Sequence, residues 1–582
     1  MNPASLGPLR VAVWTSLMLG AMGGCGSTGP NGNPPLPSEA CIGQPVTQLA
    51  VGQHAVLDPA ATSGCLRIPI ADASGAQHLL VLASTNGTRS SSGIEGTYLL
   101  RASQPVPAAG PSAAPSSPAP SPTGSLALPQ ESGLLGGPPR SPAAAEFDGA
   151  LRERERRLLS DPRYQRRPVA APAGVIGPAP PLGDLRTFKA CANLLCSSFA
   201  NVTATARFIG EHLAIYLDNN APANDPLTNA DLAELGAAFD AYHYPIDTTA
   251  FGRESDIDGN GVVIMLMTKA VNDLTPDCDK GRVVGFFFGG DLLVGPNSNR
   301  AEIFYTLVPA PATSGCTVVT RRMAINNLKP TLIHEFQHMI SFNQHALVRT
   351  GLSEDTWLNE ALSHLAEELG GRLIPASECT LLGFPSCRSQ YSSGNIINGY
   401  DYLKDTDTNY VFFPNATPGN LPERGAGWLF LRWALDQFAT DTISGTPTTR
   451  ALVQTSATGS ANLVAATGGS LSALVPQWLM ALYLDDGPDL PEEPTGRLRY
   501  KSWGLRAIWS NPENFSGGFP LVPPSITGTF SKSGALKAGS GQHFVLVQPA
   551  LGAPLDLQVL RSAAGAQLSP DLQARFGIVR IR

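Results

Sequence analysis

Hydrophobic and polar positions follow different patterns in three parts of this chain. From residue 41 to about 103, short apolar runs such as 78–82 and 98–100 alternate with Gly, Ser and Asn turns, a pattern typical of strands. The same pattern returns after about residue 491, with strands expected at 542–547 and 578–581. Between these parts, strand-like runs come first and helical periodicity comes later, which predicts an α+β fold.

The central part carries the strongest periodic signals. Apolar runs at 213–217 and 262–267 predict strands, and apolar residues repeating at helical spacing predict helices at 229–242, 329–345, 353–370 and 427–438. Thr356 is the expected N-cap of the third helix, and Gly370-Gly371 its expected end. We therefore expect a central domain at 182–490, an N-terminal β-rich domain at 41–103 and a C-terminal β-rich domain at 491–582.

Residues 104–181 differ in composition from the segments on either side. The chain holds 59 Gly and 51 Pro in 582 residues, and this segment is rich in Pro, Ala and Ser. Such a composition cannot bury enough apolar surface to fold alone, so we expect a linker or a propeptide junction. Its one periodic stretch predicts a short charged helix at 146–159. Whether residues 26 to about 146 form an inhibitory prosegment stays open at this point.

The N-terminus has the features of an export signal. An apolar stretch at 11–22 follows Arg10 and is too short for a permanent membrane span. Small residues directly precede Cys25 in Met22-Gly23-Gly24-Cys25. This resembles a bacterial lipobox, which implies a signal peptide at 1–24, a lipid on Cys25 and a tether at 25–40. The alternatives are a plain secretory signal with an incidental cysteine, or an apolar N-terminal helix.

We therefore expect an exported protein that is held by a lipid at the outer membrane or cell surface. The alternative is that it is released from the cell. The eight other cysteines lie in four neighbouring pairs, and an even number in an exported chain indicates disulfides rather than free buried thiols. The formal net charge is −7 and the sequence has no basic patch to neutralise phosphates. These features argue against nucleic acid as a partner.

The strongest chemical signal is the sequence His334-Glu335-Phe336-Gln337-His338 inside the predicted helix 329–345. In a helix, histidines four residues apart lie on one face, so both imidazoles can reach a single Zn²⁺. Glu335 is offset around the helix and can reach water at the metal. The alternative is a pair of histidines on a solvated helix face.

A catalytic zinc site needs a third protein ligand. Glu360, in the predicted helix 353–370, is our candidate, because two packed helices would then present His334, His338 and Glu360 to one metal. An exposed surface charge is the alternative for Glu360. The competing third ligands are His345, Glu354, Asp355 and His364.

The sequence HEFQHMISF followed by TWLNEALSHLAEEL resembles the gluzincin class and, within it, the hyicolysin-type metallopeptidase family. Corroborating stretches, from GDLRTF through LDNN, DIDGNG and AEIFY to GAGWLFLR, extend this resemblance over roughly residues 183–438. The resemblance implies a zincin-like core, with Zn²⁺ held by His334, His338 and Glu360. It implies hydrolysis of peptide bonds by a metal-activated water, with Glu335 as general base.

We accordingly expect a zinc metalloendopeptidase that acts on protein or peptide substrates. Two alternatives stay open: a zinc-bearing but inactive envelope binding protein, and a non-catalytic adhesion lipoprotein built from the β-rich domains. The sequence departs from related enzymes at His364, where they often carry an acidic or small residue, and Glu367 or Glu368 is the expected substitute for orienting a ligand. The candidates for stabilising the transition state are Tyr400, Tyr402, Tyr410 and Arg432.

A second metal loop is indicated before the strand at 262–267. Asp256, Asp258 and Asn260 alternate with Ile257 and Gly259, and oxygen donors at this spacing suit Ca²⁺. A full EF-hand is excluded because its last ligand position falls on Met267. An abbreviated calcium loop competes with a tight Asp/Gly turn that enters a strand.

Overall fold

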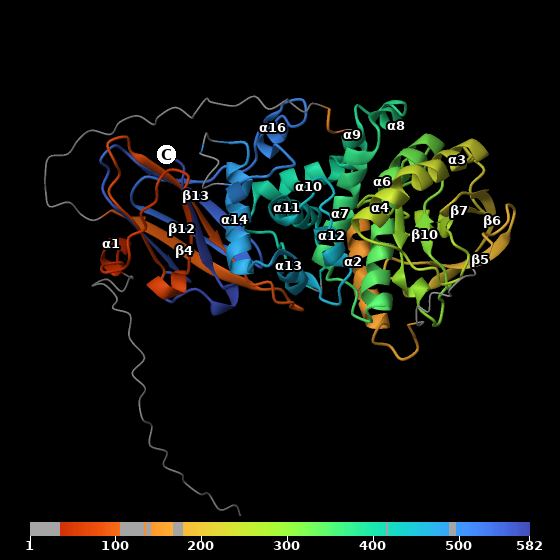
Figure 1. Cartoon of the computed structure of the whole chain (residues 1–582), viewed down its shortest axis with the longest axis horizontal. Helices are drawn as coiled ribbons and strands as arrows, with labels where there is room; N and C mark the ends of the chain where they lie inside the picture. The colour runs from red at the N-terminus through yellow and green to blue at the C-terminus, as the bar shows by residue number, and fades with distance from the viewer. Residues whose placement is uncertain are drawn as a thin grey trace, which may run out of the picture.

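The computed structural model describes residues 35–104, 133–135, 141–166, 178–414, 417–487, 490 and 496–582. The expected signal segment 1–24 and Cys25 lie outside these residues, and of the expected tether only residues 35–40 are described, including the short helix α1 (Pro37–Ala40). The described chain forms three β-sheets with helices around and between them, so the predicted α+β class is confirmed (Figure 1).

The central domain is built on a six-stranded sheet with the order β5-β6-β7-β8-β10-β9. Its strands are β5 (Leu185–Cys191), β6 (Phe199–Ile209), β7 (Leu213–Asp218), β8 (Val263–Met267), β9 (Gly285–Phe287) and β10 (Ile303–Thr306). The strands β7, β8 and β10 run parallel, whereas β9 pairs antiparallel with β10 and forms one edge. Every residue of β8 and β10 is buried, which explains why these strands read as continuous apolar runs.

Helix α6 (Arg321–Phe342) packs against β9 and β10 and continues into a π-helical turn, η4 (Asn343–Val348). The side chain of Phe336 packs on Phe239 and Phe304, with ring centroids 5.1 and 6.1 Å away. Helix α7 (Thr356–Leu373) packs between α6 and α11 (Leu421–Phe438). The predicted helices at 329–345, 353–370 and 427–438 are thereby confirmed, with shifted ends.

Two predicted boundaries of α7 are wrong. Asp355 is the N-cap residue and Thr356 is already helical, a shift of the size usual at helix ends. The helix passes through Gly370-Gly371 and ends at Leu373. A Cβ on Gly370 would lie 2.8 Å from the ring of Tyr391, and one on Gly371 would lie 2.7 Å from Ser392 Oγ. These glycines therefore allow neighbouring segments to approach α7 closely and do not terminate it.

The remaining helices cover the sheet and connect the domains. They are η2 (Phe239–His243), η3 (Gly289–Leu292), α3 (Asn229–Ala238), α4 (Tyr244–Ala250), α5 (Lys269–Asn272), α8 (Ala376–Thr380), α9 (Cys387–Tyr391), α10 (Ser393–Lys404), α12 (Thr448–Val453), α13 (Gly459–Thr467), α14 (Leu471–Leu484), η5 (Gly496–Leu498) and α16 (Leu505–Ser510). No single helix among the described residues is long and apolar enough to cross a membrane, although the bent pair α13–α14 passes that test when taken together.

The β-rich segments at the two ends of the chain pair with each other. One sheet has the order β1-β15-β3-β13-β11 and the other β12-β4-β14-β2. Their strands are β1 (His54–Leu57), β2 (Cys65–Ile68), β3 (Ala76–Ala83), β4 (Glu95–Ser103), β11 (Ser525–Ile526), β12 (Phe530–Lys537), β13 (Gly541–Gln548), β14 (Leu555–Leu560) and β15 (Arg575–Arg580); the short helices η1 (Pro59–Thr62) and η6 (Pro570–Leu572) lie in their connections.

Strand β3 lies between β13 and β15, and β4 lies between β12 and β14. Side chains from both segments share one core, including Leu80, Leu100, Phe544, Leu557 and Phe576. The two segments that we expected as separate domains therefore form a single β-sandwich. Four short strands do not bury a sheet on their own, and pairing between distant segments leaves no local pattern in the sequence.

The predicted charged helix exists as α2 (Pro142–Leu158), but it is not a spacer. Phe147, Leu151, Arg152 and Glu155 are buried, and α2 packs against α7 and η3 of the central domain. Figure 1 shows α2, in orange, among helices that come much later in the chain.

Four disulfides join the neighbouring cysteines. They are Cys41–Cys65, Cys191–Cys196, Cys278–Cys316 and Cys379–Cys387. Each bond closes a local loop, and none links the N-terminal strands to the rest of the chain.

Candidate metal centre

Helices α6 and α7 bring three potential metal ligands together in the interior of the central domain. His334 Nε2 lies 3.7 Å from Glu360 Oε2, and His338 Nε2 lies 3.6 Å from Glu360 Oε1. The two imidazole rings have centroids 4.8 Å apart and are nearly perpendicular. At most 1% of any of these three residues is exposed to solvent. The helical spacing of the histidines and the packing of α7 on α6 produce this arrangement.

The donor set fits a tetrahedral metal ion. Ligand atoms at 2.0–2.1 Å from a tetrahedral Zn²⁺ lie about 3.4 Å from one another. The observed separations of 3.6 and 3.7 Å between each imidazole nitrogen and the Glu360 carboxylate are close to that value. Two nitrogen donors and one carboxylate also match the chemistry of zinc sites that keep one position open. His334, His338 and Glu360 therefore form a group that can hold a metal ion.

The ring nitrogens that face away from this group are also bonded. Glu367 Oε1 lies 2.7 Å from His334 Nδ1, and Asn359 Oδ1 lies 2.6 Å from His338 Nδ1. Since both acceptors favour the tautomer with hydrogen on Nδ1, each Nε2 lone pair is directed to the metal position. Burial, with a smaller contribution from the nearby charge of Arg152, lowers the pKa of His338 well below its ordinary value. The imidazole of His338 is therefore neutral, as a metal ligand must be.

Glu360 is held by an arginine that the sequence reasoning missed. Arg424, on α11, has its Nη1 atom 2.5 Å from Glu360 Oε2 and 3.3 Å from Asp148 of α2. Its Nη2 atom donates to the Ala145 carbonyl at 2.8 Å. Arg432 of the same helix, a candidate for transition-state stabilisation, pairs with Asp436 at 3.0 Å. The helix predicted at 427–438 includes Arg432 but not Arg424, because α11 begins earlier, at Leu421. The packing of α11 places Arg424 beside Glu360.

Glu335 points from α6 to the edge strand β9. Its Oε2 atom accepts a hydrogen bond of 2.9 Å from the Phe287 N–H. This backbone bond fixes the carboxylate beside the ligand group, at the strand where the six-stranded sheet ends. The residue is 2% exposed.

The other candidate ligands lie outside the group. His345 Nε2 lies 3.6 Å from Glu354, and Asp355 pairs with Arg156 at 3.5 Å. His364 Nδ1 lies 3.4 Å from Glu367 Oε2, so these two residues and His334 form an overlapping cluster. Of the two expected substitutes, Glu367 contacts a ligand histidine, whereas Glu368 accepts hydrogen bonds from Trp428 and Trp503.

The tyrosines considered for transition-state stabilisation have other contacts. Tyr402 is fully buried and stacks on Trp478, and Tyr400 stacks on Phe515. The ring centroid of Tyr410 lies 4.8 Å from the Lys537 ammonium, a cation–π contact. The structure therefore gives none of these three tyrosines a contact with the ligand group among the described residues.

The loop before β8 contains a second cluster of oxygen donors. Carboxylate oxygens of Asp256, Asp258 and Glu302 lie within 4.8 Å of one another. Asn260, the third expected calcium ligand, donates to Asp258 at 2.9 Å, and its oxygen accepts from the Val262 N–H. Glu302 adds a buried carboxylate that the sequence did not indicate. It comes from the segment before β10, so only the pairing of β8 with β10 brings it to this loop.

Comparison with known proteins supports the resemblance read from the motifs. The chain is 27% identical over 192 residues to the neutral metalloprotease ShpI of Staphylococcus hyicus, a match that covers 32% of this chain and 40% of that protein. No protein-family model matches the chain. An M1 zinc metallopeptidase from Deinococcus radiodurans superimposes with a TM-score of 0.27 at 14% identity, over 51% of this chain and 52% of that one. A mutant form of that enzyme, bound to a Tyr-Ser-Ala substrate, also gives a TM-score of 0.27, at 13% identity over 51% and 61% of the two chains.

The chain thus spans less than half the length of the curated relative that it matches. The similarity nevertheless agrees with the resemblance that the motifs around His334 and Glu360 predicted. Over 192 of its residues, this chain is similar in sequence to a neutral metalloprotease.

Proposed function

We propose that this protein is a zinc-dependent endopeptidase whose metal is held by His334, His338 and Glu360. The observation that supports the proposal is the buried group of two imidazole nitrogens and one carboxylate, with separations of 3.6 and 3.7 Å. Zn²⁺ bound there supplies Lewis-acid chemistry, since it lowers the pKa of water and polarises a carbonyl. The sequence similarity to a neutral metalloprotease is consistent with this assignment.

The protein's own residues would divide the remaining work. Glu335, fixed by the Phe287 N–H, takes a proton from the attacking water and passes it to the leaving amine. Glu367 and Asn359 hold the two ligand histidines in the required tautomer. β9 is an edge strand, and an extended peptide could pair with its outer backbone groups once the contact of Arg152 with the Phe287 carbonyl is released.

The test is the zinc content and casein hydrolysis of the chain that starts after Cys25, compared with its Glu335→Ala variant. Hydrolysis is measured before and after mild proteolysis of the Pro-rich segments 105–132 and 167–177, because the sequence leaves an inhibitory prosegment open. We expect near-stoichiometric zinc in both proteins, and hydrolysis only in the parent. A folded parent that binds no zinc would overturn the proposal and favour the adhesion lipoprotein.

We also propose that the protein is exported and anchored by a lipid on Cys25. The lipobox-like residues 22–25 and the four disulfides, which form in oxidising compartments, support this location. A Cys25→Ser variant should move from the membrane fraction to the soluble fraction of the producing cell. Equal membrane association of both forms would contradict the anchor.

Finally, we propose that Asp256, Asp258 and Glu302 bind Ca²⁺. Glu302 is 1% exposed; its Oε1 atom accepts from Ser255 and the Ile257 N–H, whereas Oε2 has no hydrogen-bond partner among the described residues. A buried carboxylate oxygen without a partner is costly, and a bound cation would offset that cost. Ca²⁺ should raise the melting temperature of the zinc-saturated protein, and Glu302→Gln should abolish the rise. A rise of equal size in the variant would refute this site.

A further inference from the structure

The segment 141–166, which contains α2, is hydrogen-bonded at both ends to residues on either side of the edge strand β9. Ser141 Oγ donates to the Arg282 carbonyl at 2.7 Å, just before β9. At the other end of the segment, the backbones of Gln165 and Val294 exchange two hydrogen bonds of 2.9 Å. Both ends of the segment 141–166 are thus attached to the loops that flank β9. In the sequence, this segment lies between Pro-rich stretches.

Side chains of α2 bind backbone groups of β9 and of the η3 turn that follows it. Arg152 Nη2 donates to the Phe287 carbonyl at 2.6 Å, and Glu155 Oε1 accepts from the Gly289 N–H at 2.6 Å. Arg152 and Glu155 also pair with each other at 3.3 Å. A peptide that added a strand to this edge would need outward-facing backbone groups of β9 such as the Phe287 carbonyl. While α2 is in place, Arg152 occupies this carbonyl.

A second set of contacts ties α2 to the metal centre. Arg424 is the link, since its guanidinium contacts Glu360, the Asp148 carboxylate and the Ala145 carbonyl. Phe147 is fully buried, with its ring edge-to-face on Phe286 of β9 at 4.9 Å. Helix α2 therefore contacts the neighbouring strand directly and the third candidate ligand through Arg424.

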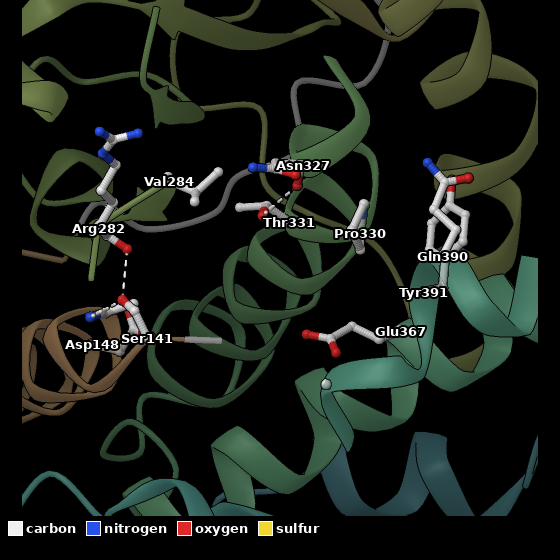
Figure 2. Close-up of a pocket in the computed structure, with 13 residues that line it drawn as sticks. Ser141, Asp148, Arg282, Val284, Asn327, Pro330, Thr331, Glu367, Gln390 and Tyr391 are labelled. Carbon is white, nitrogen blue, oxygen red and sulfur yellow. Dashed lines mark hydrogen bonds between the residues drawn. The ribbon is translucent and has the colours of Figure 1, made fainter. Parts of the chain in front are cut away.

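The cavity beside α2 and Glu367 is small. A cavity of about 40 Å³ is lined by Ser141, Ala144 and Asp148 on one side and by Glu367 on another. Figure 2 shows Asp148 and Ser141 of the α2 region facing this space, with Glu367 across it. Sites that bind small molecules usually measure about 300–1,000 Å³, so a peptide cannot enter here while α2 is seated.

We infer that residues 141–166 are an autoinhibitory segment, which occupies the peptide-binding cleft of the peptidase and must leave it before a substrate can bind. The inference rests on the proposed function, whose site it regulates. The earlier strands β1 to β4 cannot leave in the same way, because they pair with β12 to β15. The inhibitory element is therefore confined to α2 and its flanks and is not the whole N-terminal region.

The first test uses the full zinc-loaded chain with Arg152→Ala and Glu155→Ala together. The matched control is Arg157→Ala with Glu153→Ala, which changes the same residue types on the same helix. Arg157 is exposed and Glu153 pairs with Arg156, so the control leaves the contacts to β9 intact. We expect casein hydrolysis to rise at least tenfold in the double variant and to stay at the parental level in the control. Equal rates in parent and double variant would overturn the inference.

A second variant unseats α2 by a different route. A Cβ on Gly149 would lie 2.2 and 2.3 Å from the Cβ and Cα atoms of Pro418, so Gly149→Ala keeps the helix but prevents its close seating. We expect activation here too. A synthetic peptide of residues 141–166 should then inhibit the activated variants, and the same peptide with the Arg152 and Glu155 changes should inhibit at least tenfold more weakly. Equal inhibition by both peptides would contradict the role of these contacts.

A binding measurement separates this inference from the proposed function. In a Glu335→Gln background, fluorescein-labelled casein should bind the Arg152/Glu155 double variant at least tenfold more tightly than the chain with native α2. Suppose that the double variant binds casein more tightly but no zinc-loaded chain with Glu335 intact hydrolyses it. That result would reject the proposed peptidase activity and support the inhibitory segment. Equal binding, together with faster hydrogen exchange at the Gly289 amide, would reject the inhibitory segment whatever the enzyme does.

Discussion

Glu367 and Glu368 show how neighbouring acidic residues receive different roles. Glu367 Oε1 contacts His334 Nδ1 at 2.7 Å, on the metal side of α7. Glu368 faces the other way, where it accepts from Trp428, Trp503 and Arg372. Successive helix positions differ by about 100° around the axis, so only one of the two can orient a ligand.

Replacing Glu367 by Gln should weaken zinc binding by about 10–100-fold, the usual effect of losing a carboxylate that orients a ligand histidine. The zinc dissociation constant, measured by competition with a chelator, checks this. Glu368→Gln is the contrast, because it should lower the free energy of unfolding and leave the zinc affinity of the folded protein nearly unchanged. Similar losses of zinc affinity in both variants would show that Glu367 has no special role.

Glu354 makes stability depend on pH. It is fully buried, and burial, reinforced by the neighbouring Asp355, raises its pKa to about 8 although Gly459 and Asn462 donate to it. Between the ordinary carboxyl pKa and about 8, the folded chain keeps this proton while the unfolded chain has lost it. This contribution to stability therefore falls as pH rises through that window, by up to about 1.4 kcal/mol per pH unit.

The measurement is chemical unfolding of the parent and of Glu354→Gln at about pH 5.5 and about pH 7.5, both inside that window. Other groups titrate in both proteins, so the difference between the two proteins isolates Glu354. The parent should lose more stability than the variant between these pH values. An equal loss in both would mean that Glu354 is ionised throughout.

Helices α10 and α11 depend on glycine for their close contact. A Cβ on Gly425 would lie 2.4 Å from the backbone carbonyl of Asn398 in α10, a distance at which the backbone must move. A Cβ on Gly427, two positions later in α11, would have the Trp357 carbonyl oxygen as its nearest neighbour, at 3.4 Å. The close approach at Gly425 places its neighbour Arg424 beside Glu360.

Gly425→Ala should therefore destabilise the protein by about 1–3 kcal/mol, the usual cost of overpacking, and should weaken zinc binding by moving Arg424. Gly427→Ala is the matched control; it should be close to neutral, because alanine favours a helix by about 1 kcal/mol over glycine. Urea unfolding and zinc competition measure the two effects. Comparable destabilisation by both substitutions would argue against a specific contact at Gly425.

Strands from the two ends of the chain pair in one β-sandwich. The N-terminal strands β1 to β4 pair with strands that follow residue 520, and the central domain lies between them in the sequence. Figure 1 shows the red and blue strands together in one body. Within the described residues, the disulfide of the N-terminal segment, Cys41–Cys65, is internal to it. Strand pairing and the shared core are therefore what hold this segment to the rest of the chain.

A single cut engineered between residues 105 and 132 should consequently leave the two fragments associated. They should co-elute in gel filtration and separate in denaturant without a reducing agent, because none of the four disulfides crosses the cut. The uncut chain is the control in both conditions. Separate elution of the fragments in native buffer would show that the sandwich does not hold them.

Features that depend on local residue spacing could be predicted from the sequence. The histidines of α6 face one metal position because a helix repeats every 3.6 residues, and the four cysteine pairs close short loops. The main helices and the strands β7, β8, β13 and β15 also appeared as periodic runs, although α6 begins at Arg321 and α11 at Leu421, before their predicted starts at 329 and 427. In each case the physical cause acts between residues that are near one another in sequence.

Features that depend on contact between distant segments could not be predicted from the sequence. Four such features arise from packing between elements far apart in the chain. They are the single sandwich formed by the terminal segments, the contact of Arg424 with Glu360, the position of Glu302 and the packing of α2 on β9. Local periodicity shows which face of an element is buried, but it does not show the partner against which that face is buried. That choice is made when the whole chain packs, and in this protein it determines how the candidate metal centre is supported and covered.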